Sequence, residues 1–400
     1  MEKLINITGK ALSGEWGIDD EEGIGISVLR TTNFTNDGII DYSNVITRTI
    51  TKKNIADKFL RKGDIIIEKS GGSDNQPVGR VVYFDNDENK YLFNNFTGLL
   101  RVKDTTKWLP KYIFYSLFAN YQSGGTRRYE NKTTGLHNLQ TDFYVKNFEI
   151  KETSYSEQIE ICELFDKITD LIDKRKQQLE KLDELVKSRF VEMFGDPNSN
   201  EKGWTVSTLG EYMTLLTDFS ANGSYELLDS NVVMYDEPNY AVMVRTTDLE
   251  AGNLTDGVKY IDRTAYELLS KSKLYGGELI MNKIGSAGKI YIMPQIDKPA
   301  SLGRNAFMFR FDDRINMVYL YALLSSDYGT KEIQQYVRGA VTKTITKEST
   351  RSIRVTVPPI ELQEQYATFV KQVDKSKFEI KQSLKMLELL KKALMQKYFG

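Results

Sequence analysis

The sequence predicts a mixed α+β fold: two homologous globular domains joined by two long antiparallel coiled-coil helices, with pseudo-twofold symmetry. An internal repeat is the first observation behind this prediction. SVLRTTNFTNDG (27–38) returns as VMVRTTDLEAGN (242–253), and GDIIIEKSGG (63–72) returns as GELIMNKIGS (277–286). The two copies lie about 215 residues apart. Such a long period with only two copies indicates a duplicated domain rather than a stack of short units.

A heptad pattern after each globular part is the second observation. Apolar residues recur alternately four and three residues apart from Ile161 to Met193, and in the same phase from Tyr366 to Tyr398. The pattern is interrupted by four cationic residues: Arg175, Arg189, Lys377 and Lys391. A heptad seam requires a partner helix, so we expect the two helices to pack against each other. The four cations either fix the register of the pair or lie at the edge of the seam.

The repeat and the helices divide the chain into four parts. We expect globular domains over 1–155 and 196–360, and long helices over 156–195 and 361–400. Short apolar runs such as DIIIE (64–68) predict strands in the globular parts. At 1.5 Å per residue, a helix over residues 157–194 would be about 57 Å long.

The composition restricts the classes of partner and compartment. The 54 Lys and Arg balance 55 Asp and Glu, so no global field attracts a polyanion, and any nucleic-acid contact must be local. A single cysteine excludes an internal disulfide and multi-cysteine zinc sites, and it fits a reducing compartment. The first 20 residues lack the apolar core of a signal peptide, and no apolar run approaches the ~18 residues that span a bilayer. We therefore expect a soluble protein in the cytoplasm of a prokaryote.

Two phrases flank the predicted helices. KLDELVKSRFVEMFGDP (181–197) ends the central helix, and VPPIELQEQ (357–365) begins the C-terminal one. Together with the order and duplication of the domains, these phrases resemble the specificity subunits of type I restriction-modification systems over essentially the whole chain. One departure is that the first half begins its helix through SYSEQIE (154–160) instead of a proline pair. A helix start is still expected there, with Ser156 as the capping residue.

The resemblance implies a role for each part. Each globular part is expected to be a target-recognition domain that reads one half of a bipartite site in double-stranded DNA. The helices are expected to set the spacer and to dock two methyltransferase subunits, with restriction or translocase subunits as further partners. S-adenosylmethionine and ATP are expected on those partner subunits, and no cofactor on this chain. Because the two halves differ at most loop positions, we expect an asymmetric site.

Catalytic chemistry is not expected from this chain. His137 aligns in the repeat with Lys343, so we expect a solvated or DNA-facing residue rather than a general base. Cys162 lies between heptad positions and is expected to be an ordinary packed or flanking thiol. Neither Gly9-Lys10 nor Gly288-Lys289 has the neighbours of a phosphate loop, and Val357 and Ile360 around the proline pair exclude the NPPY loop of adenine methyltransferases. We predict a chain without catalytic or metal-binding residues.

Two basic segments are candidates for DNA contact, because bases and phosphates are usually read by Arg, Lys and polar side chains on exposed loops. The first is 124–138, with Arg127, Arg128, Lys132 and His137. Its counterpart is 337–354, with Arg338, Lys343, Lys347 and Arg351. Either segment could instead be a solvated loop.

Two glycine-flanked loops are further candidates. Residues 68–80 carry Lys69 and Arg80, and residues 282–289 carry Lys283 and Lys289. Glycine lets a backbone approach DNA closely, but the same pattern is also common in ordinary β-hairpin turns. Arg30 and Arg245, which end matching strand-like runs, are either structural or base-contacting.

Two other functions fit the same sequence. A stand-alone bipartite DNA-binding regulator or antirestriction protein would share the duplicated fold, but it would need a larger basic footprint for affinity. A coiled-coil scaffold without DNA would tolerate charge reversal in the basic segments. Co-purification with methyltransferase subunits would distinguish the first alternative from a specificity subunit, and methylation by charge-reversed variants would exclude the second.

Overall fold

The computed structural model describes residues 1–86, 89–133 and 136–400. The chain divides into two compact units, which we call unit 1 (Met1–Lys176 with Lys381–Gly400) and unit 2 (Gln177–Ile380). The divisions fall inside the two longest helices, α4 (Tyr155–Phe194) and α11 (Ile360–Phe399). Each unit therefore contains one globular part together with a portion of both helices.

Unit 1 is built on two four-stranded sheets. The first has the order β2-β10-β6-β8 and is antiparallel: β2 (Leu12–Ser13), β10 (Thr97–Leu100), β6 (Ile65–Glu68) and β8 (Val81–Tyr83). The second has the order β3-β5-β4-β9: β3 (Ile18–Asp19), β5 (Ile46–Thr49), β4 (Ile26–Leu29) and β9 (Tyr91–Phe93). In this sheet β4 and β9 are parallel. All four residues of β6 are buried, as expected for a strand that is covered on both faces.

Smaller elements complete unit 1. A three-stranded sheet has the order β11-β12-β7, with β11 (Glu130–Thr133), β12 (Leu136–Leu139) and β7 (Ser70–Gly72). β1 (Glu2–Lys3) pairs with β13 (Glu149–Ile150), and the helices are α1 (Leu4–Thr8), α2 (Pro110–Gln122) and α3 (Thr141–Asn147). Helix α2 begins with proline, whose missing N–H costs nothing at the first helical position. Its buried face packs in one core cluster with residues of β6, α4 and α11.

Unit 2 repeats this arrangement. One sheet has the order β15-β22-β19-β20: β15 (Met213–Asp218), β22 (Ala306–Phe311), β19 (Leu279–Asn282) and β20 (Ile290–Ile292). The other has the order β17-β16-β21-β18: β17 (Lys259–Ile261), β16 (Ala241–Val244), β21 (Ala300–Leu302) and β18 (Lys273–Leu274). As with β4 and β9 in unit 1, β16 and β21 are parallel. The sequence repeat is therefore a repeat of the fold, as predicted.

The remaining elements of unit 2 lie around these sheets. β14 (Thr205–Thr208) pairs with β23 (Arg354–Val357). The shorter helices are α5 (Tyr225–Asn231), α6 (Thr246–Ala251), α7 (Arg263–Leu268), α8 (Met317–Ser325), α9 (Asp327–Gln334) and α10 (Lys347–Arg351). The main core of this unit contains residues of β19, β22, α8, α4 and α11. Within the described residues, no helix has the length and apolar character required to cross a membrane.

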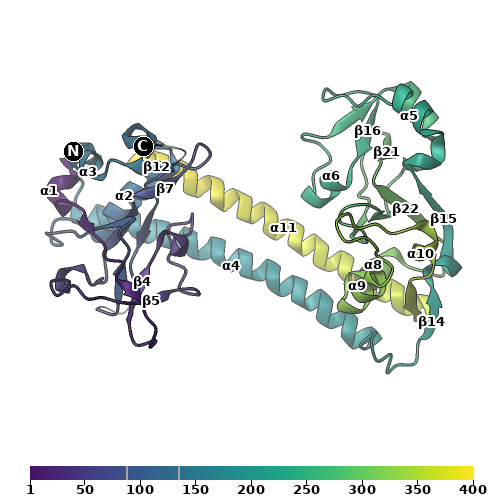
Figure 1. Cartoon of the computed structure of the whole chain (residues 1–400), viewed down its shortest axis with the longest axis horizontal. Coiled ribbons are helices and arrows are strands. Elements are labelled where there is room, and N and C mark those ends of the chain that lie inside the picture. Colours follow the sequence, from purple (N-terminus) through teal and green to yellow (C-terminus); the bar gives the residue numbers. More distant parts are fainter. Residues whose placement is uncertain (87–88, 134–135) are drawn as a thin grey trace. The chain divides into compact units, whose positions relative to one another are not determined.

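Helices α4 and α11 pack against each other in both units (Figure 1). In unit 1, Phe165 near the start of α4 contacts Phe399 at the end of α11, with 5.8 Å between the centroids of the tilted rings. In unit 2, Phe190 and Phe194 near the end of α4 contact Tyr366 near the start of α11, at 5.6 and 5.5 Å. The two helices are therefore antiparallel, as the heptad pattern predicts.

Lys377, Arg189 and Lys391, which interrupt the heptads, have contacts with the opposite helix or the adjacent core. Lys377 of α11 donates to Asp183 of α4 at 2.5 Å. Arg189 of α4 lies 5.8 Å from the ring centroid of Phe369 on α11, and Lys391 lies 6.0 Å from that of Phe118. Burial lowers the pKa of Lys391. The contacts of Lys377 and Arg189 join the two helices, which favours a role in register over a position at the seam edge.

Candidate DNA interface

The predicted segments of unit 1 come together around Lys69. The backbone N–H of Lys69 donates to the carbonyl of Phe96 at 2.8 Å, and the N–H of Leu139 donates to the carbonyl of Lys69 at 2.8 Å. Strand β7, directly after Lys69, pairs with β12 of the basic segment. The glycine-flanked loop and the basic segment therefore share one surface with the turn before β10.

Unit 2 contains the same junction around Lys283. The N–H of Lys283 donates to the carbonyl of Asn305 at 2.9 Å, and the N–H of Ile345 donates to the carbonyl of Lys283 at 3.0 Å. Thr344 forms bridges to Ile284 and to Arg338, where unit 1 has the strands β7, β12 and β11. We call this surface, made of the lysine loop, the basic segment and the turn, the junction surface of each unit.

Exposed cations of the first basic segment lie at the edge of the junction surface. Arg127 is exposed and donates to the carbonyl of Asp74 at 2.9 Å. Arg128 is exposed, with its guanidinium 4.9 Å from the ring centroid of Tyr129. The backbone of Lys132 is part of β11, but its side chain lies outside the described residues. Within the part of the chain that the structure describes, Arg127 and Arg128 have no ion pair that a ligand would have to break.

His137 is buried, so the expectation of a solvated or ligand-facing ring is wrong. Its side chain is 5% exposed, because the β11–β12 hairpin packs on β7. Nδ1 lies 2.8 Å from Oε2 of Glu130, and Nε2 lies 3.4 Å from Oδ1 of Asp74. Its counterpart in unit 2, Lys343, is exposed. The geometry gives His137 a structural role and leaves Lys343 accessible.

Arg80 has internal partners for its guanidinium. It donates to Glu68 at 3.1 Å and to the carbonyls of Phe34 and Thr31 at 2.8 and 3.0 Å. Burial raises the pKa of Glu68, opposed by the charge of Arg80. Lys69 donates to the hydroxyl of Ser13 at 3.0 Å, and burial lowers the pKa of Lys69. Arg80 therefore supports the fold of the loop, whereas Lys69 has a neutral partner that it can exchange for an anion.

Two lysines of unit 2 share one buried carboxylate. Lys283 and Lys347 each donate to Asp218 at 2.8 Å. Burial acts to raise the pKa of Asp218, but the hydrogen bonds and charges of the two lysines outweigh it and leave the pKa lowered. Both ammonium groups also lie about 6 Å from the ring centroid of Phe307. The cluster has one excess positive charge, and Lys347, with 41% of its side chain exposed, is the accessible member.

The other candidates of unit 2 differ in their availability. Lys289 forms an ion pair with Glu250, which raises the pKa of Lys289. Arg338 is exposed and donates to the carbonyls of Gln335 and Val337. Lys343 and Arg351 are exposed. Three cations, Arg338, Lys343 and Arg351, thus have no ion pair with a carboxylate within residues 1–86, 89–133 and 136–400.

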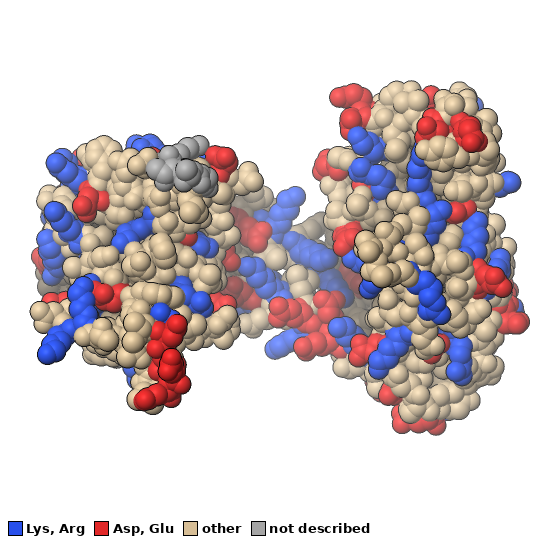
Figure 2. All heavy atoms as spheres, viewed as in Figure 1, with Lys and Arg blue, Asp and Glu red and all other residues tan. Residues whose placement is uncertain are grey.

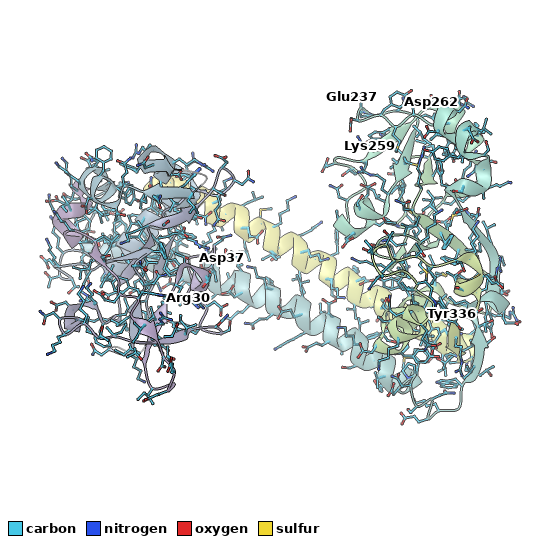
Figure 3. The ribbon with its side chains drawn as sticks, viewed as in Figure 1. Arg30, Asp37, Glu237, Lys259, Asp262 and Tyr336 are labelled. Atoms are coloured by element: carbon cyan, nitrogen blue, oxygen red, sulfur yellow. The ribbon has the colours of Figure 1, made fainter. Side chains whose placement is uncertain are left out.

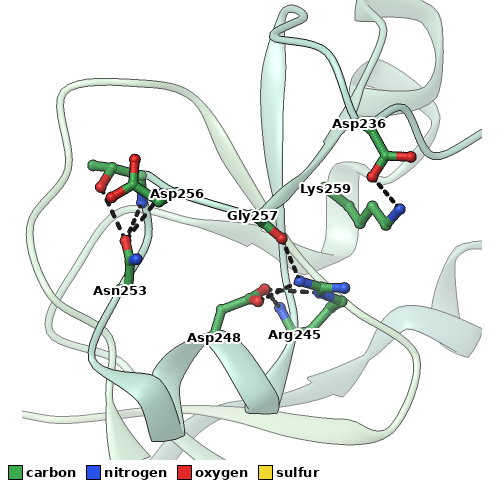
Figure 4. A network of polar contacts seen from close by, with 8 residues as sticks. Asp236, Arg245, Asp248, Asn253, Asp256, Gly257 and Lys259 are labelled. Carbon is green, nitrogen blue, oxygen red and sulfur yellow. Dashed lines mark hydrogen bonds and ion pairs between the residues drawn. The ribbon is translucent and has the colours of Figure 1, made fainter. Parts of the chain in front are cut away.

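Arg30 and Arg245 have matching structural roles. The backbone N–H of each donates to a side-chain oxygen of the residue three positions on, Asn33 or Asp248, at 2.9 Å in both cases. The guanidinium of Arg245 also binds Asp248 and donates to the carbonyl of Gly257 at 2.9 Å (Figure 4). Arg30, labelled in Figure 3, donates to the carbonyl of Asn44 at 3.0 Å. The two arginines therefore stabilise the loops after β4 and β16 through these hydrogen bonds.

The charges on the visible face are mixed. Figure 2 shows Lys and Arg side chains interspersed with Asp and Glu on each unit, without a continuous basic face. Among the described residues, no group of three or more His, Cys, Asp or Glu is placed to hold a metal ion. Cys162 is buried, and burial raises its pKa to about 12, so the thiol is protonated at neutral pH. This agrees with an ordinary packed cysteine.

One part of the junction surface is missing from the sequence prediction. The turns before β10 and β22 expose Phe96 and Asn305, which are uncharged and differ between the repeats. A sequence search for basic and glycine-rich segments does not identify these two residues, because they are neither basic nor glycine. They would have been found by aligning the two repeats and looking for positions that differ between strands that are similar.

Comparisons with known proteins agree on one family. A family model described as "Type I restriction modification DNA specificity domain" matches residues 3–184 and 201–389. The type I restriction enzyme MjaVIII specificity subunit of Methanocaldococcus jannaschii is 24% identical over 296 residues, which are 71% of this chain and 68% of that protein. The putative type I restriction enzyme MjaX specificity subunit of the same organism is 21% identical over 393 residues, 94% of this chain and 87% of that protein.

Solved structures show the same fold. The type I restriction-modification S subunit from M. genitalium has a TM-score of 0.56 at 16% identity, covering 100% of this chain and 95% of that one. A chain from a study of complex assembly and conformational transition of the type I R-M system has a TM-score of 0.57 at 15% identity, covering 99% and 96%.

Proposed function

The chain belongs to the family of type I restriction-modification DNA specificity subunits, and from this membership we propose that each unit reads one half of an asymmetric bipartite site in double-stranded DNA. One observation carries the proposal: the same junction surface is built twice on matching strands, with different exposed side chains. Matching backbones support a common mode of docking, and different side chains support different half-sites.

The exposed cations are proposed to hold the DNA in register. Arg127 and Arg128 serve unit 1, and Arg338, Lys343 and Arg351 serve unit 2, together with Lys69 and Lys347 at the centre of each junction surface. Phosphate contacts of this kind fix position without reading sequence. Paired cations such as Arg80, Lys283 and Lys289, and the buried His137, are proposed to shape the loops instead.

Reactivity is proposed to come from other chains. S-adenosylmethionine and ATP would be bound by methyltransferase and restriction or translocase subunits, with two methyltransferase subunits docked along the helices. Exposed apolar side chains on α11 support this docking, among them Phe378 at 61% and Met386 at 68% exposure. Large apolar side chains on an otherwise charged helix are typical of a protein contact.

The helices are also proposed to set the spacer between the half-sites. A helix of 40 residues rises about 60 Å, which corresponds to about 18 base pairs. Removing seven residues from both α4 and α11 would shorten this by about 10 Å, or about three base pairs. The spacer should change while the two half-site sequences stay the same. A change of half-site identity would contradict this role.

The principal test maps N6-methyladenine across a genome with the chain, without it, and with the double variant Arg338→Glu, Lys343→Glu. We expect a bipartite methylated motif that depends on the chain and is lost or weakened in the variant. The matched control is Lys298→Glu, an exposed lysine at the opposite end of β21 from the junction surface. Unchanged methylation in the double variant would refute DNA contact by this segment. Tight binding of one site by the isolated chain, without co-purifying methyltransferase, would favour a stand-alone regulator.

A further inference from the structure

Each junction surface contains a three-residue turn between its two sheets. Residues 94–96 join β9 to β10 in unit 1, and residues 303–305 join β21 to β22 in unit 2. The preceding strands are parallel to β4 and β16, respectively, and the following strands pair with β6 and β19. The two turns are thus equivalent in length and in their place in the fold.

The backbone of both turns is held by hydrogen bonds on either side. Asn94 donates from its N–H to the carbonyl of Leu29 at 3.0 Å, and Gly303 donates to the carbonyl of Val244 at 2.8 Å. Thr97 closes the first turn with N–H and hydroxyl bonds to the carbonyl of Asn94. A Cβ at position 303 would lie 2.9 Å from the carbonyl oxygen of Val244, so the close approach requires glycine. These hydrogen bonds fix the backbone of both turns, whose last residues, Phe96 and Asn305, are exposed.

The tips of the turns expose unlike side chains beside the lysine loops. The carbonyls of Phe96 and Asn305 accept the N–H of Lys69 and Lys283, which fixes both residues next to the central lysines. Phe96 is 53% exposed although it is aromatic, and Asn305 is exposed. The strands on either side are buried in both units. The repeat therefore preserves the position and varies the chemistry.

Arg304, next to Asn305 in the turn, lines a recess in unit 2. Its guanidinium donates to Asp229 at 3.0 Å and lies 5.2 Å from the ring centroid of Phe219. Together with Met234 and Asn305 it lines a recess of about 280 Å³. The guanidinium of Arg304 already has a carboxylate and an aromatic ring as partners. The side-chain amide of Asn305, which is exposed, has no such partner among the described residues.

We propose that Phe96 and Asn305 are specificity-determining residues of the two units, a proposal that rests on the proposed DNA-reading function. An asparagine amide matches the N6 donor and N7 acceptor of adenine in the major groove. A phenylalanine ring cannot form such hydrogen bonds and instead contacts the C5 methyl group of thymine. Asn305 reads an adenine in one half-site, and Phe96 reads a thymine in the other, while Lys69 and Lys347 hold phosphates.

The test uses the chain assembled with its methyltransferase and a library of duplexes randomised within each half-site. Asn305→Ala should relax preference for adenine at one position by about tenfold or more, in one half-site only. Asn305→Asp keeps the shape but is an acceptor only, so the preference at that position should move to cytosine. Phe96→Ala should relax one thymine in the other half-site.

Two controls match these variants. Asn239→Ala changes an exposed asparagine just before β16, and Ile24→Ala changes an 82% exposed apolar residue just before β4. Because β16 and β4 are parallel to the strands that end in the turns, both controls lie at the opposite ends of their sheets. We expect the controls to leave both half-sites unchanged.

Either of two results would overturn the proposal. One is unchanged preference in both half-sites for Asn305→Ala and Phe96→Ala, and the other is an equal loss of preference in the variants and their controls. In the first case the proposed function still stands if Arg338→Glu, Lys343→Glu weakens methylation. If methylation does not depend on the chain at all, the proposed function fails as well, so the two failures are distinguishable.

Discussion

Replacing Asp218 by asparagine should destabilise unit 2, because this residue holds two lysines in a partly buried cluster. Asp218 is 6% exposed and accepts a hydrogen bond from Lys283 and from Lys347. Asparagine keeps the size of the side chain and removes its charge. The variant leaves Lys283, whose side chain is only 15% exposed, without a carboxylate.

The magnitude follows from the exposure of the two lysines. A hydrogen bond to a charged group contributes about 1.5–3 kcal/mol when it is shielded from water, which applies to Lys283. Lys347 is 41% exposed, so solvent screening reduces its pair to about 0.2–1 kcal/mol. The variant should therefore lower the free energy of opening of unit 2 by about 2–4 kcal/mol, or about 30- to 900-fold in the opening equilibrium.

Hydrogen exchange resolves the effect by unit. Where exchange proceeds through opening of unit 2, peptides from β15, β19 and β22 should exchange about 30- to 900-fold faster at pH 7. Peptides from unit 1 should not change. Glu250→Gln is the matched control, because it removes the carboxylate from an exposed pair with Lys289. That control should change exchange little.

The pH dependence gives a second check on the same pair. The pKa of Asp218 is lowered below 3.8 in the folded chain. A carboxyl group with a lowered pKa stabilises the fold above its unfolded pKa, and the contribution is lost as the pH falls through the folded pKa. The ratio of exchange rates between variant and parent should thus be full at pH 7 and shrink below about pH 4. Equal exchange at pH 7, or a ratio that persists below the folded pKa, would refute the reasoning.

Three further predictions follow from burial and pairing. Tyr366→Ala should cost about 3–5 kcal/mol, measured by denaturant unfolding, because Tyr366 is 1% exposed between two phenylalanines of α4, and a loss below about 1 kcal/mol would contradict the packing. Cys162 should resist a thiol reagent at pH 8 in the native chain and react after denaturation, since burial raises its pKa to about 12. Arg80→Ala should lower the melting temperature, whereas Arg127→Ala should reduce DNA binding at unchanged melting temperature, because only Arg80 is held by a buried carboxylate.

The fold could be predicted from the sequence because its signals are local or repeated. The spacing of apolar residues from Ile161 to Met193 defines a helix without knowledge of its partner. The second copy of each motif then shows that the strand-rich segments belong to one kind of domain. Topology such as the parallel pairing of β4 with β9 was not accessible, because these strands are separated by the whole β5–β8 region.

The state of several candidate cations could not be predicted, because their partners lie far away in the sequence. Lys283 and Lys347 are 65 and 129 residues from Asp218, and Arg80 is 46 and 49 residues from two of its carbonyl partners. Charge and glycine content identify loops, but they do not distinguish a cation that supports a loop from one that faces a ligand. His137 shows the same limit, since a hairpin contact rather than its own neighbours buries it.

The pairing of these cations also explains how a chain with a formal charge of −1 can serve DNA recognition. Each phosphate neutralised contributes about −0.9 to the slope of log affinity against log salt. Among the described residues, three cations at each junction surface have no ion pair, and they would contribute a slope of only about −3 per unit. In the assembly that we propose, most of the attraction would come from partner subunits, and this chain would be free to carry neutral side chains where bases are read. Affinity for DNA and discrimination between bases would then depend on different residues. The uncharged turn residues Phe96 and Asn305 lie where we propose that bases are discriminated.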